Sequence, residues 1–306
     1  MTKLLFDQNF EPRYGQAVSV RDGLLRITCN NPSPLTFHGT NSYLVGKDRL
    51  ILVDPGPVNE QHLTALLDAI DGRPLDAILI THCHVDHSPL AVKLKELTNA
   101  PIWGCAQYSR APAFEELSTT IMDGSNDANY APDRVLEDGE HLTLAGSRLK
   151  VIATPGHTMN HLCFSLLDYG VILSGDHVMG WSTTVVAPPD GDMASYMASL
   201  NKLGEQGELR YFPAHGGEIH RPLSYLKALA AHRRTRENAI LSAVQNGCFT
   251  VSHITDKVYS GLETKLIAAA SLNVLAHLQH LYDQKLITYE GPISFDSHFR
   301  ACERPS

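Results

Sequence analysis

The chain has 306 residues, of which 43% are hydrophobic and 19% are charged, a balance typical of a soluble globular protein with a substantial core. Its net charge of −8 disfavours non-specific attraction to nucleic acid. No apolar run reaches the length of a membrane span, and residues 1–7 lack the apolar stretch of a signal peptide, so we expect a cytoplasmic protein without membrane contact. The six cysteines form no Cys-x-x-Cys pair, which argues against a zinc knuckle and a redox dithiol.

The first third of the chain alternates short apolar runs with stretches of helical periodicity. This pattern predicts strands over residues 24–29, 43–46, 50–53, 77–81 and 101–104, and helices over residues 61–70 and 90–98. Asp54 directly follows the third strand and is expected at its tip. Ser88 is expected to cap the second helix, with Pro89 as its first residue.

The middle of the chain repeats this texture after an irregular stretch. Residues 111–138 are rich in Pro, Gly, Asp, Asn and Ser, which predicts a long loop and a candidate cover for a functional site. Hairpins are predicted over residues 141–153 and 162–173, followed by a helix over 194–203 and a strand over 209–212. Strands that alternate with helices in two successive halves favour two packed sheets with outer helices.

After about residue 220 the pattern becomes mainly helical. Helices are predicted over residues 222–245, 250–259 and 263–284, and residues 286–289 and 293–300 are expected to pair as a small ribbon. Three helices followed by a ribbon is the order of a winged-helix unit. We therefore expect one domain over residues 1–220 and a smaller, winged-helix-like domain over residues 221–306.

Residues 82–87 carry the pattern His-x-His-x-Asp-His on a tight loop between a predicted strand and a predicted helix. Alternate residues of an extended segment point the same way, so His82 and His84 can bind one metal ion. Asp86 and His87 fall where the chain turns and can face a second ion. Three imidazoles and a carboxylate within six positions are a ligand set for zinc or a similar transition metal. A histidine-rich surface loop without a metal is the less favoured interpretation.

Four motifs follow one another along the chain: His-x-His-x-Asp-His, Pro-Gly-His-Thr, Ser-Gly-Asp and Pro-x-His-Gly. Together they resemble the metallo-β-lactamase-fold hydrolase superfamily over roughly residues 20–220. The resemblance implies an α/β (α+β) fold, an αββα sandwich with a dinuclear metal centre at one edge. With Gly39-Thr40-Asn41-Ser42-Tyr43 and the winged-helix-like part, the whole chain resembles the branch of the β-lactamase-like-protein-2 endoribonuclease. Glyoxalase-II-like thioesterases share every metal ligand and stay open as the related alternative.

The resemblance also implies a role for each motif residue. The first metal would be bound by His82, His84 and His157, the second by Asp86, His87 and His215, and Asp176 would bridge the two. Two zinc ions are expected, although a carboxylate bridge also suits manganese or iron. Two such cations about 3.5–4 Å apart hold a shared water and lower its pKa to about 7, and Asp86 would orient the resulting hydroxide as the catalytic carboxylate.

Other residues are candidates for supporting roles. Asp54 would hold the metal loop without binding metal. His177 would either donate to a ligand carboxylate or simply be packed, and both interpretations stay open. In the loop 178–192, Trp181 offers an apolar platform for substrate, with a core position as its alternative. Arg233 and Arg234, on the first C-terminal helix near a third arginine, could bind a phosphate or carboxylate, although a solvated helix face is the favoured alternative.

These observations predict a dinuclear metal-dependent hydrolase. Its substrate would be a small-molecule thioester or other activated ester, or a phosphodiester in single-stranded RNA. True zinc β-lactamases of the main class have a cysteine at the position of Asp176, so antibiotic hydrolysis is disfavoured. The alternative function is nucleic-acid binding through the winged-helix-like domain, but residues 263–284 offer Lys265 alone in their first half, which is weak for reading DNA. We expect this domain to act as a cover for the active site or as a homodimer element.

Overall fold

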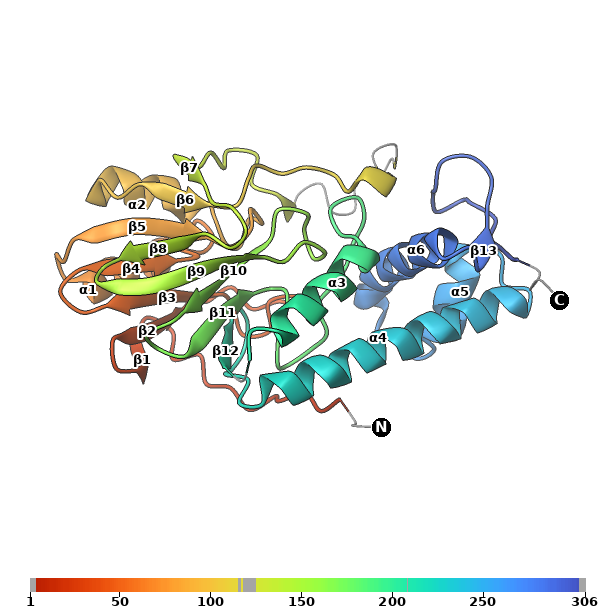
Figure 1. Ribbon diagram of the computed structural model, residues 1–306, viewed down its shortest axis with the longest axis horizontal. Helices are drawn as coiled ribbons and strands as arrows, with labels where there is room; N and C mark the ends of the chain where they lie inside the picture. Colours follow the sequence, from red (N-terminus) through yellow and green to blue (C-terminus); the bar gives the residue numbers. More distant parts are fainter. Residues whose placement is uncertain (1–3, 115–116, 118–124, 208, 303–306) are drawn as a thin grey trace.

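Two β-sheets pack face to face in the middle of the protein, with helices on both outer faces and a helical unit at the C-terminal end (Figure 1). The computed structural model describes residues 4–114, 117, 125–207 and 209–302. The expected α/β class and the αββα order of layers are confirmed. Among these described residues, no helix combines the length and apolar character needed to cross a bilayer.

The first sheet contains seven strands in sequence order, antiparallel from β1 to β4 and parallel from β4 to β7. They are β1 (Val18–Arg21), β2 (Leu24–Thr28), β3 (Asn41–Gly46), β4 (Leu50–Val53), β5 (Leu75–Ile80), β6 (Ile102–Gly104) and β7 (Arg134–Val135). Helices α1 (Glu60–Ile70) and α2 (Leu90–Thr98) form the crossovers that parallel strands require. Asn59 caps α1 by accepting a hydrogen bond from the His62 N–H.

The second sheet contains five strands in the order β12-β11-β10-β9-β8, and its single parallel pair is β11 with β12. They are β8 (His141–Leu144), β9 (Ser147–Ala153), β10 (Leu162–Leu166), β11 (Val171–Gly175) and β12 (Arg210–Pro213). Helix α3 (Met193–Gly204) connects β11 to β12 and is capped by the Asp192 carboxylate. All six elements lie within about two residues of the predicted ranges.

Side-chain alternation in the second sheet divides its residues between two cores. On β10, Leu162 and Phe164 pack toward the first sheet, whereas Cys163 packs toward the outer layer of α3 and α4 (Pro222–Gln245). In the first sheet, β4 is buried along its whole length because α1 and α2 cover the outer face. The sheets therefore share one continuous core, and the functional residues must come from the edges.

The C-terminal unit consists of α4, α5 (Val251–Val258), α6 (Ile267–Asp283), β13 (Ile287–Thr288) and β14 (Arg300–Ala301). Helix α4 belongs to two cores: Leu226 and Leu229 pack on the second sheet, whereas Ile240 and Val244 pack on α5 and α6. Figure 1 shows this helix running from the sandwich to the far end of the molecule. The division between residues 220 and 221 stays a prediction, because α4 begins at that point and serves both parts.

Some local expectations need correction. Ser88 does not cap α2, because its hydroxyl donates to Asp127 and Pro89 takes the cap position. The third C-terminal helix begins with a short 3₁₀ helix, Thr264–Leu266. Of residues 293–300, the last alone belongs to β14. Strands β1 and β7 were not expected. Strand β7 lies in the predicted loop 111–138, and residues 112–114 of that loop form a 3₁₀ helix. Residues 115, 116 and 118–124 of the loop lie outside the described part.

A partly buried carboxylate joins α4 to α6 and leads to a testable prediction. Glu237 Oε2 accepts hydrogen bonds from His277 Nδ1 at 3.1 Å and from His280 Nδ1 at 2.6 Å. Burial alone would raise the pKa of Glu237, but these hydrogen bonds lower it to about 2, from an ordinary value of 4.5. We expect Glu237→Gln to lower the free energy of unfolding by about 1–3 kcal/mol at pH 7, measured by denaturant unfolding.

The pH dependence follows from the sign of this shift. Because the pKa of Glu237 is depressed in the folded state, its stabilisation is complete above about pH 4.5 and is lost as the pH falls toward 2. Glu263→Gln is the matched control, since Glu263 forms an exposed pair with Lys265. Equal losses in the two variants would contradict a stabilising role for Glu237.

Candidate metal centre

The predicted ligand residues meet at one edge of the sandwich because the strands that precede them end there. β5 ends just before the His-x-His-x-Asp-His loop, and β11 and β12 end just before Asp176 and His215. A backbone hydrogen bond of 2.8 Å from the Leu162 N–H to the Thr81 carbonyl ties the two sheets together at this edge. All seven predicted ligands consequently occupy one region.

The seven side chains form three overlapping groups whose ligand atoms lie within 4.8 Å of one another. The groups are His82, His84 and His157; His82, His87 and Asp176; and Asp86, His87 and His215. We call the three histidines of the first group the first focus. The second focus comprises Asp86, His87, Asp176 and His215.

In the first focus, the inward nitrogens lie unusually close together. His84 Nδ1 is 3.0 Å from His82 Nε2 and 3.2 Å from His157 Nε2. The outward nitrogens face oxygen acceptors: His157 Nδ1 donates to the Val185 carbonyl at 2.7 Å, and His84 Nε2 donates to the Asp190 carboxylate at 3.1 Å. In a neutral ring, a proton on the outward nitrogen leaves a lone pair on the inward one.

His82 follows the same rule through a hydroxyl. Its Nδ1 lies 3.0 Å from Thr81 Oγ1, whose own proton goes to Asp54 at 2.7 Å, so the hydroxyl accepts from His82. Three lone pairs therefore point at one another, and they repel unless a cation lies between them. A metal ion can bind all three at once, whereas a proton is shared by two, so the first focus fits a metal ion.

The second focus combines two imidazoles with two carboxylates. His215 Nδ1 donates to the Gly39 carbonyl at 3.2 Å, which leaves its Nε2 facing Asp86 and Asp176 at 3.3 and 3.2 Å. His87 Nε2 is buried, has no hydrogen-bond partner within the described chain, and lies 3.5 Å from Asp86 and 3.6 Å from Asp176. Mixed nitrogen and carboxylate ligands suit zinc, manganese or iron.

The electrostatic environment differs between the two foci. Burial, with smaller effects from neighbouring imidazoles, lowers the pKa of His82 well below its ordinary value and that of His157 to about 4. Burial alone would raise the pKa of Asp86 and Asp176, but His87 and His215 hold both well below the ordinary value. Burial alone would lower the pKa of the other three histidines as well, but Asp190 raises that of His84, and the carboxylates of Asp86 and Asp176 raise that of His87 well above its ordinary value and that of His215 to about 10. The second focus therefore holds ionised carboxylates and retains protons that a bound cation would replace.

Asp54 has the position that the sequence predicts, at the tip of β4. Its carboxylate accepts from the Thr81 N–H at 2.8 Å, from the Thr81 hydroxyl at 2.7 Å and from His87 Nδ1 at 3.0 Å. The residue has a left-handed backbone with φ of 49°, which Asp tolerates better than most residues. It holds the loop and orients His87 without facing either focus.

Sequence reasoning missed the loop that follows Asp176 as a source of supporting groups. The Val185 carbonyl and the Asp190 carboxylate orient His157 and His84 as described above. Asn126 also donates to Asp190, at 3.3 Å, which brings the middle of the long loop 111–138 beside the metal loop. A carboxylate in a Pro-Pro-Asp-Gly turn gives no periodic signal, so tertiary structure alone reveals this role.

Asn41 is a second residue that sequence reasoning did not assign. Its amide donates to the carbonyls of Pro213 at 3.1 Å and Gly216 at 2.9 Å, so it holds both sides of His215 from the first sheet. The Tyr43 hydroxyl donates to the Pro213 carbonyl as well, at 2.7 Å. The sequence analysis singled out residues 39–43 for their resemblance to one branch of the superfamily, but it did not predict that Asn41 holds the His215 loop.

The two additional histidines near the site behave differently. His161 Nε2 accepts from the Asp176 N–H at 3.1 Å and its Nδ1 bonds the Thr154 hydroxyl at 2.8 Å, the structural role that a buried histidine commonly has. Of the two interpretations left open for His177, the structure agrees with the packed histidine and not with donation to a ligand carboxylate. The buried ring of His177 packs against Tyr196, with centroids 4.6 Å apart, and neither ring nitrogen has a hydrogen-bond partner within the described chain.

Trp181 lies beside the His215 loop and is partly buried. Its ring stacks on Phe37, with centroids 4.8 Å apart, and it covers Gly216 so closely that a Cβ there would come within 2.9 Å of the indole. Its Nε1 is buried without a hydrogen-bond partner among the described residues. A contact between Trp181 and substrate stays a prediction that this position permits.

The arginines of α4 point to three different places. Arg233 is 3% exposed and contacts the Thr184 carbonyl and Asn273, so the expected solvated face is wrong for this residue. Arg236 bonds the Val258 carbonyl at 2.6 Å. Arg234 is exposed. These side chains do not converge on one ligand in this structure, so substrate binding by Arg233 and Arg234 stays a prediction without a contact to support it.

Comparison with known proteins agrees with this geometry. Residues 35–215 match the Metallo-beta-lactamase superfamily, and residues 250–292 match a Beta-lactamase associated winged helix domain. The chain is 32% identical to the "Beta-lactamase-like protein 2 homolog" of Drosophila melanogaster, over 84% of this chain and 87% of that protein. It is 30% identical to the "Atrochrysone carboxyl ACP thioesterase" of Aspergillus chevalieri, over 77% of this chain and 73% of that protein.

Solved structures show the same fold over nearly the whole chain. A beta-lactamase domain protein from Burkholderia ambifaria matches with a TM-score of 0.80 at 22% identity, covering 95% of each chain. The superfamily match itself spans more than half of the 306 residues. The protein belongs to the metallo-beta-lactamase superfamily, as a hydrolase with lactamase-like relatives and a C-terminal winged helix domain.

Proposed function

We propose that the protein is a dinuclear metal-dependent hydrolase that cleaves an ester-type bond, with thioesters and other activated esters as its preferred substrates. The observation that carries the proposal is the convergence of five imidazoles and two carboxylates on two adjacent foci. We assign the first focus to one metal, the second focus to another, and Asp176 to the bridge between them. Zinc is the first candidate for both, and manganese or iron also suits this ligand set.

The metal ions and the residues around the foci would have different roles in hydrolysis. When bound, a metal pair of this kind supplies a nucleophile from water at neutral pH and polarises the bond under attack. Asp86 is suited to orient that water and accept its proton, because its side chain is 22% exposed whereas those of His87 and His215 are almost fully buried. Thr40 Oγ1 donates to Asp86 Oδ2 at 3.4 Å and helps to fix the carboxylate.

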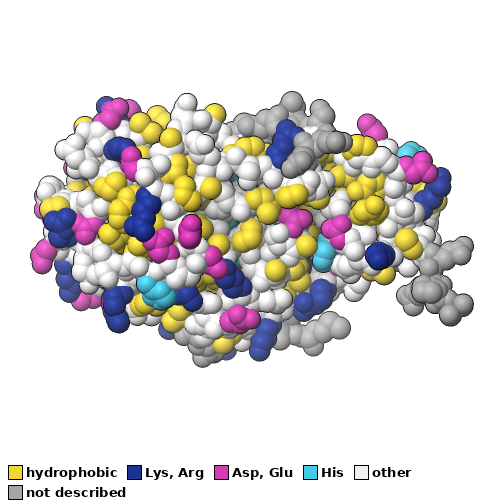
Figure 2. Space-filling model, turned by 45° about the horizontal axis from the view of Figure 1, so that its top comes forward, with side chains coloured by type: hydrophobic (Ala, Val, Ile, Leu, Met, Phe, Trp, Pro, Cys, Tyr) yellow, Lys and Arg dark blue, Asp and Glu magenta, His cyan; other side chains and the backbone are white. Residues whose placement is uncertain are grey.

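Two observations support an ester or thioester over RNA. The relative from Aspergillus chevalieri is named as a thioesterase, and it covers most of this chain. A single-stranded RNA needs basic contacts to its phosphates, yet Arg233 and Arg236 are engaged by the protein itself. On the face shown in Figure 2, cationic and anionic side chains are interspersed and form no continuous basic strip outside the grey residues.

The winged helix domain lacks the features expected of a domain that binds nucleic acid. Its third helix, α6, contains no Lys or Arg from Ile267 to Asp283, and residues 272–279 are all buried. A recognition helix instead needs an exposed face with side chains that reach base edges. In this protein α6 is a core helix, packed between α4 and α5.

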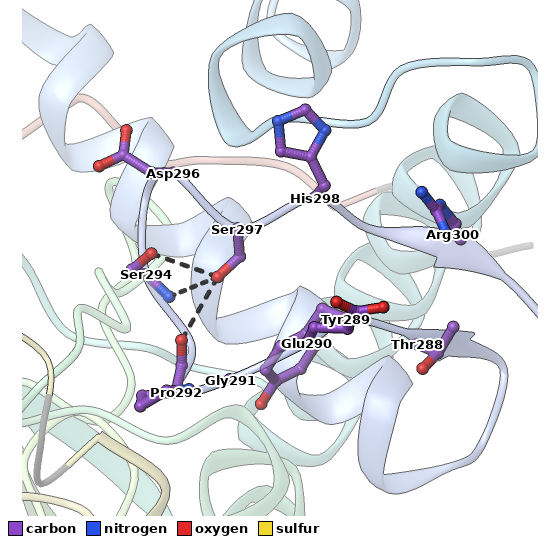
Figure 3. A pocket seen from close by; sticks show the side chains of 10 residues that line it. All are labelled: Thr288, Tyr289, Glu290, Gly291, Pro292, Ser294, Asp296, Ser297, His298 and Arg300. Atoms are coloured by element: carbon purple, nitrogen blue, oxygen red, sulfur yellow. Dashed lines mark hydrogen bonds between the residues drawn. The ribbon is translucent and has the colours of Figure 1, made fainter.

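A separate pocket of about 360 Å³ lies in the ribbon region of this domain (Figure 3). Its wall includes Glu290 and Asp296 as well as Arg300, so the charges are mixed. Ser297 Oγ is engaged within the loop, since it accepts from the Ser294 N–H at 2.9 Å. This wall does not resemble a basic cradle for phosphates. A role of the domain in homodimer formation stays a prediction.

Metal content is the first test. We expect elemental analysis of the purified protein to find about two divalent cations per chain, because the two foci share a bridging carboxylate. Removal with a chelator should abolish hydrolysis, and free zinc at about 100 times its dissociation constant should restore about 2.7 kcal/mol of stability per site. A stoichiometry of one cation or none would contradict the dinuclear assignment.

Loss of Asp86 tests the chemistry. We expect Asp86→Ala to lower the turnover of S-acylglutathione and acyl-coenzyme-A thioesters by at least about 100-fold, because the group that orients the water is lost. Circular dichroism should show an unchanged fold. Asp168→Ala is the control, since Asp168 forms a surface ion pair with Arg148 at the end of β9 and β10 that lies away from the two foci. Near-normal turnover in Asp86→Ala would overturn the mechanism.

The same assay distinguishes the substrate classes when single-stranded RNA replaces the thioesters. RNA cleavage that disappears in Asp86→Ala, with thioesters left intact, would contradict the preferred substrate and identify an endoribonuclease. Thioester turnover with intact RNA would support the proposal as stated.

Asp190 gives an independent test of the first focus. Asp190→Asn removes the charge that holds the proton on His84 Nε2, so we expect zinc affinity to fall by about 10–100-fold, measured by competition with a chromogenic chelator. Asp192→Asn is the matched control two residues away, because Asn also caps a helix well. Unchanged zinc affinity in Asp190→Asn would show that His84 does not depend on this carboxylate.

A further inference from the structure

One peptide group links the winged helix domain to the first focus. The Val186 N–H donates to Asn273 Oδ1 on α6 at 3.1 Å, and the Val185 carbonyl accepts from His157 Nδ1 at 2.7 Å. This N–H and this carbonyl belong to the same planar peptide unit, so the orientation of one determines the orientation of the other. Hydrogen bonds on both sides of one peptide also polarise each other.

Arg233 completes this contact from α4. Its guanidinium donates to the Thr184 carbonyl, and Nη1 lies 3.4 Å from Asn273 Oδ1. The Thr184 hydroxyl in turn lies 2.7 Å from the carbonyl oxygen of Asp176. Residues 184–186 are therefore held by two helices of the C-terminal unit on one side and contact two assigned ligands on the other.

The environment of Arg233 is unusual for an arginine. The residue is 3% exposed, it forms no salt bridge with any carboxylate of the described chain, and its Nε is buried without a partner there. Its charge is balanced by carbonyl dipoles, the Asn273 amide and the ring of Tyr196, whose centroid lies 4.9 Å from the guanidinium carbon. Because removing a cation from water is costly, the buried guanidinium must keep these contacts, and they hold residues 184–186 in one arrangement.

We propose that Asn273 and Arg233 are positioning residues for the first focus, and that the winged helix domain determines metal affinity through the Val185–Val186 peptide. The proposal rests on the metal assignment made above. It gives the domain a function in the hydrolase that requires neither nucleic acid nor a partner. Without Asn273, the peptide can rotate, the Val185 carbonyl no longer faces His157, and the imidazole loses its fixed tautomer and direction.

The chain offers matched controls for both residues. Arg236 lies one helical turn from Arg233 and makes an equivalent pair of contacts, to the Val258 carbonyl and over the Tyr259 ring at 4.2 Å, but it holds α5. Gln279 is a buried amide on α6, like Asn273, and bonds Asp283 and Tyr289. Substitutions at the control positions should disturb the C-terminal unit without reaching the first focus.

The test compares zinc affinity and the visible spectrum of the cobalt-substituted full-length protein. Asn273→Leu and Arg233→Met should each weaken zinc binding by about tenfold and change the cobalt absorption bands, because the geometry at His157 changes. Gln279→Leu and Arg236→Met should lower the melting temperature without either effect. Asn273→Asp, which keeps the acceptor for the Val186 N–H, should retain the wild-type spectrum.

The outcomes separate this proposal from the proposed function. If wild type binds no metal, the metal assignment fails and the positioning role fails with it. If wild type binds zinc and Asn273→Leu and Arg233→Met bind it as tightly as their controls, the positioning role alone is overturned. If Asn273→Leu does not fold, the comparison of Arg233→Met with Arg236→Met decides.

Discussion

The proposed centre depends on how five buried imidazoles are oriented. A neutral imidazole carries one proton, so an acceptor on its outer nitrogen leaves the inner nitrogen with a lone pair. The acceptors are Asp54 for His87, Gly39 for His215, Val185 for His157, Asp190 for His84 and Thr81 for His82. Because the rings are buried, water cannot easily take the place of these acceptors. Loss of one acceptor would free the ring to turn or to change tautomer.

The fold brings these acceptors together from segments that are far apart in the chain. Asp54 comes from the tip of β4, and residues 39–43 contact the His215 loop from the edge of the first sheet. Val185 and Asp190 come from the loop that follows β11. The two sheets must therefore be packed in the correct register before any focus exists, which couples metal binding to folding.

The winged helix domain shows that a fold name does not determine a function. Its third helix is largely buried, and Asn273 on this helix contacts the loop that follows Asp176. Arg233, which composition alone would place on a solvated face, is among the most buried charged residues. In our proposal, the domain positions the residues of the first focus.

Sequence alone was sufficient for much of the architecture. Apolar runs and helical periodicity locate β2–β6, β8–β12 and α1–α5, because local burial patterns follow the period of each element. The seven proposed ligand residues follow from the motifs that resemble the superfamily, and the structure brings them within reach of one another. Short elements such as β1 and β7 escaped prediction, because a strand of two to four residues has too little periodicity to detect.

What only the tertiary structure decided is the set of partners around those ligands. Asp190, Val185 and Asn273 are ordinary polar or backbone groups in irregular or buried segments, and nothing in their local sequence distinguishes them from neighbours such as Asp192. Their roles come from contacts between residues up to 176 positions apart, as between Gly39 and His215. A ligand motif can be recognised in the sequence because its residues share one loop. An acceptor for a ligand histidine can come from anywhere in the chain, provided that it lies within hydrogen-bond distance of the ring. The packing of the whole chain determines that distance.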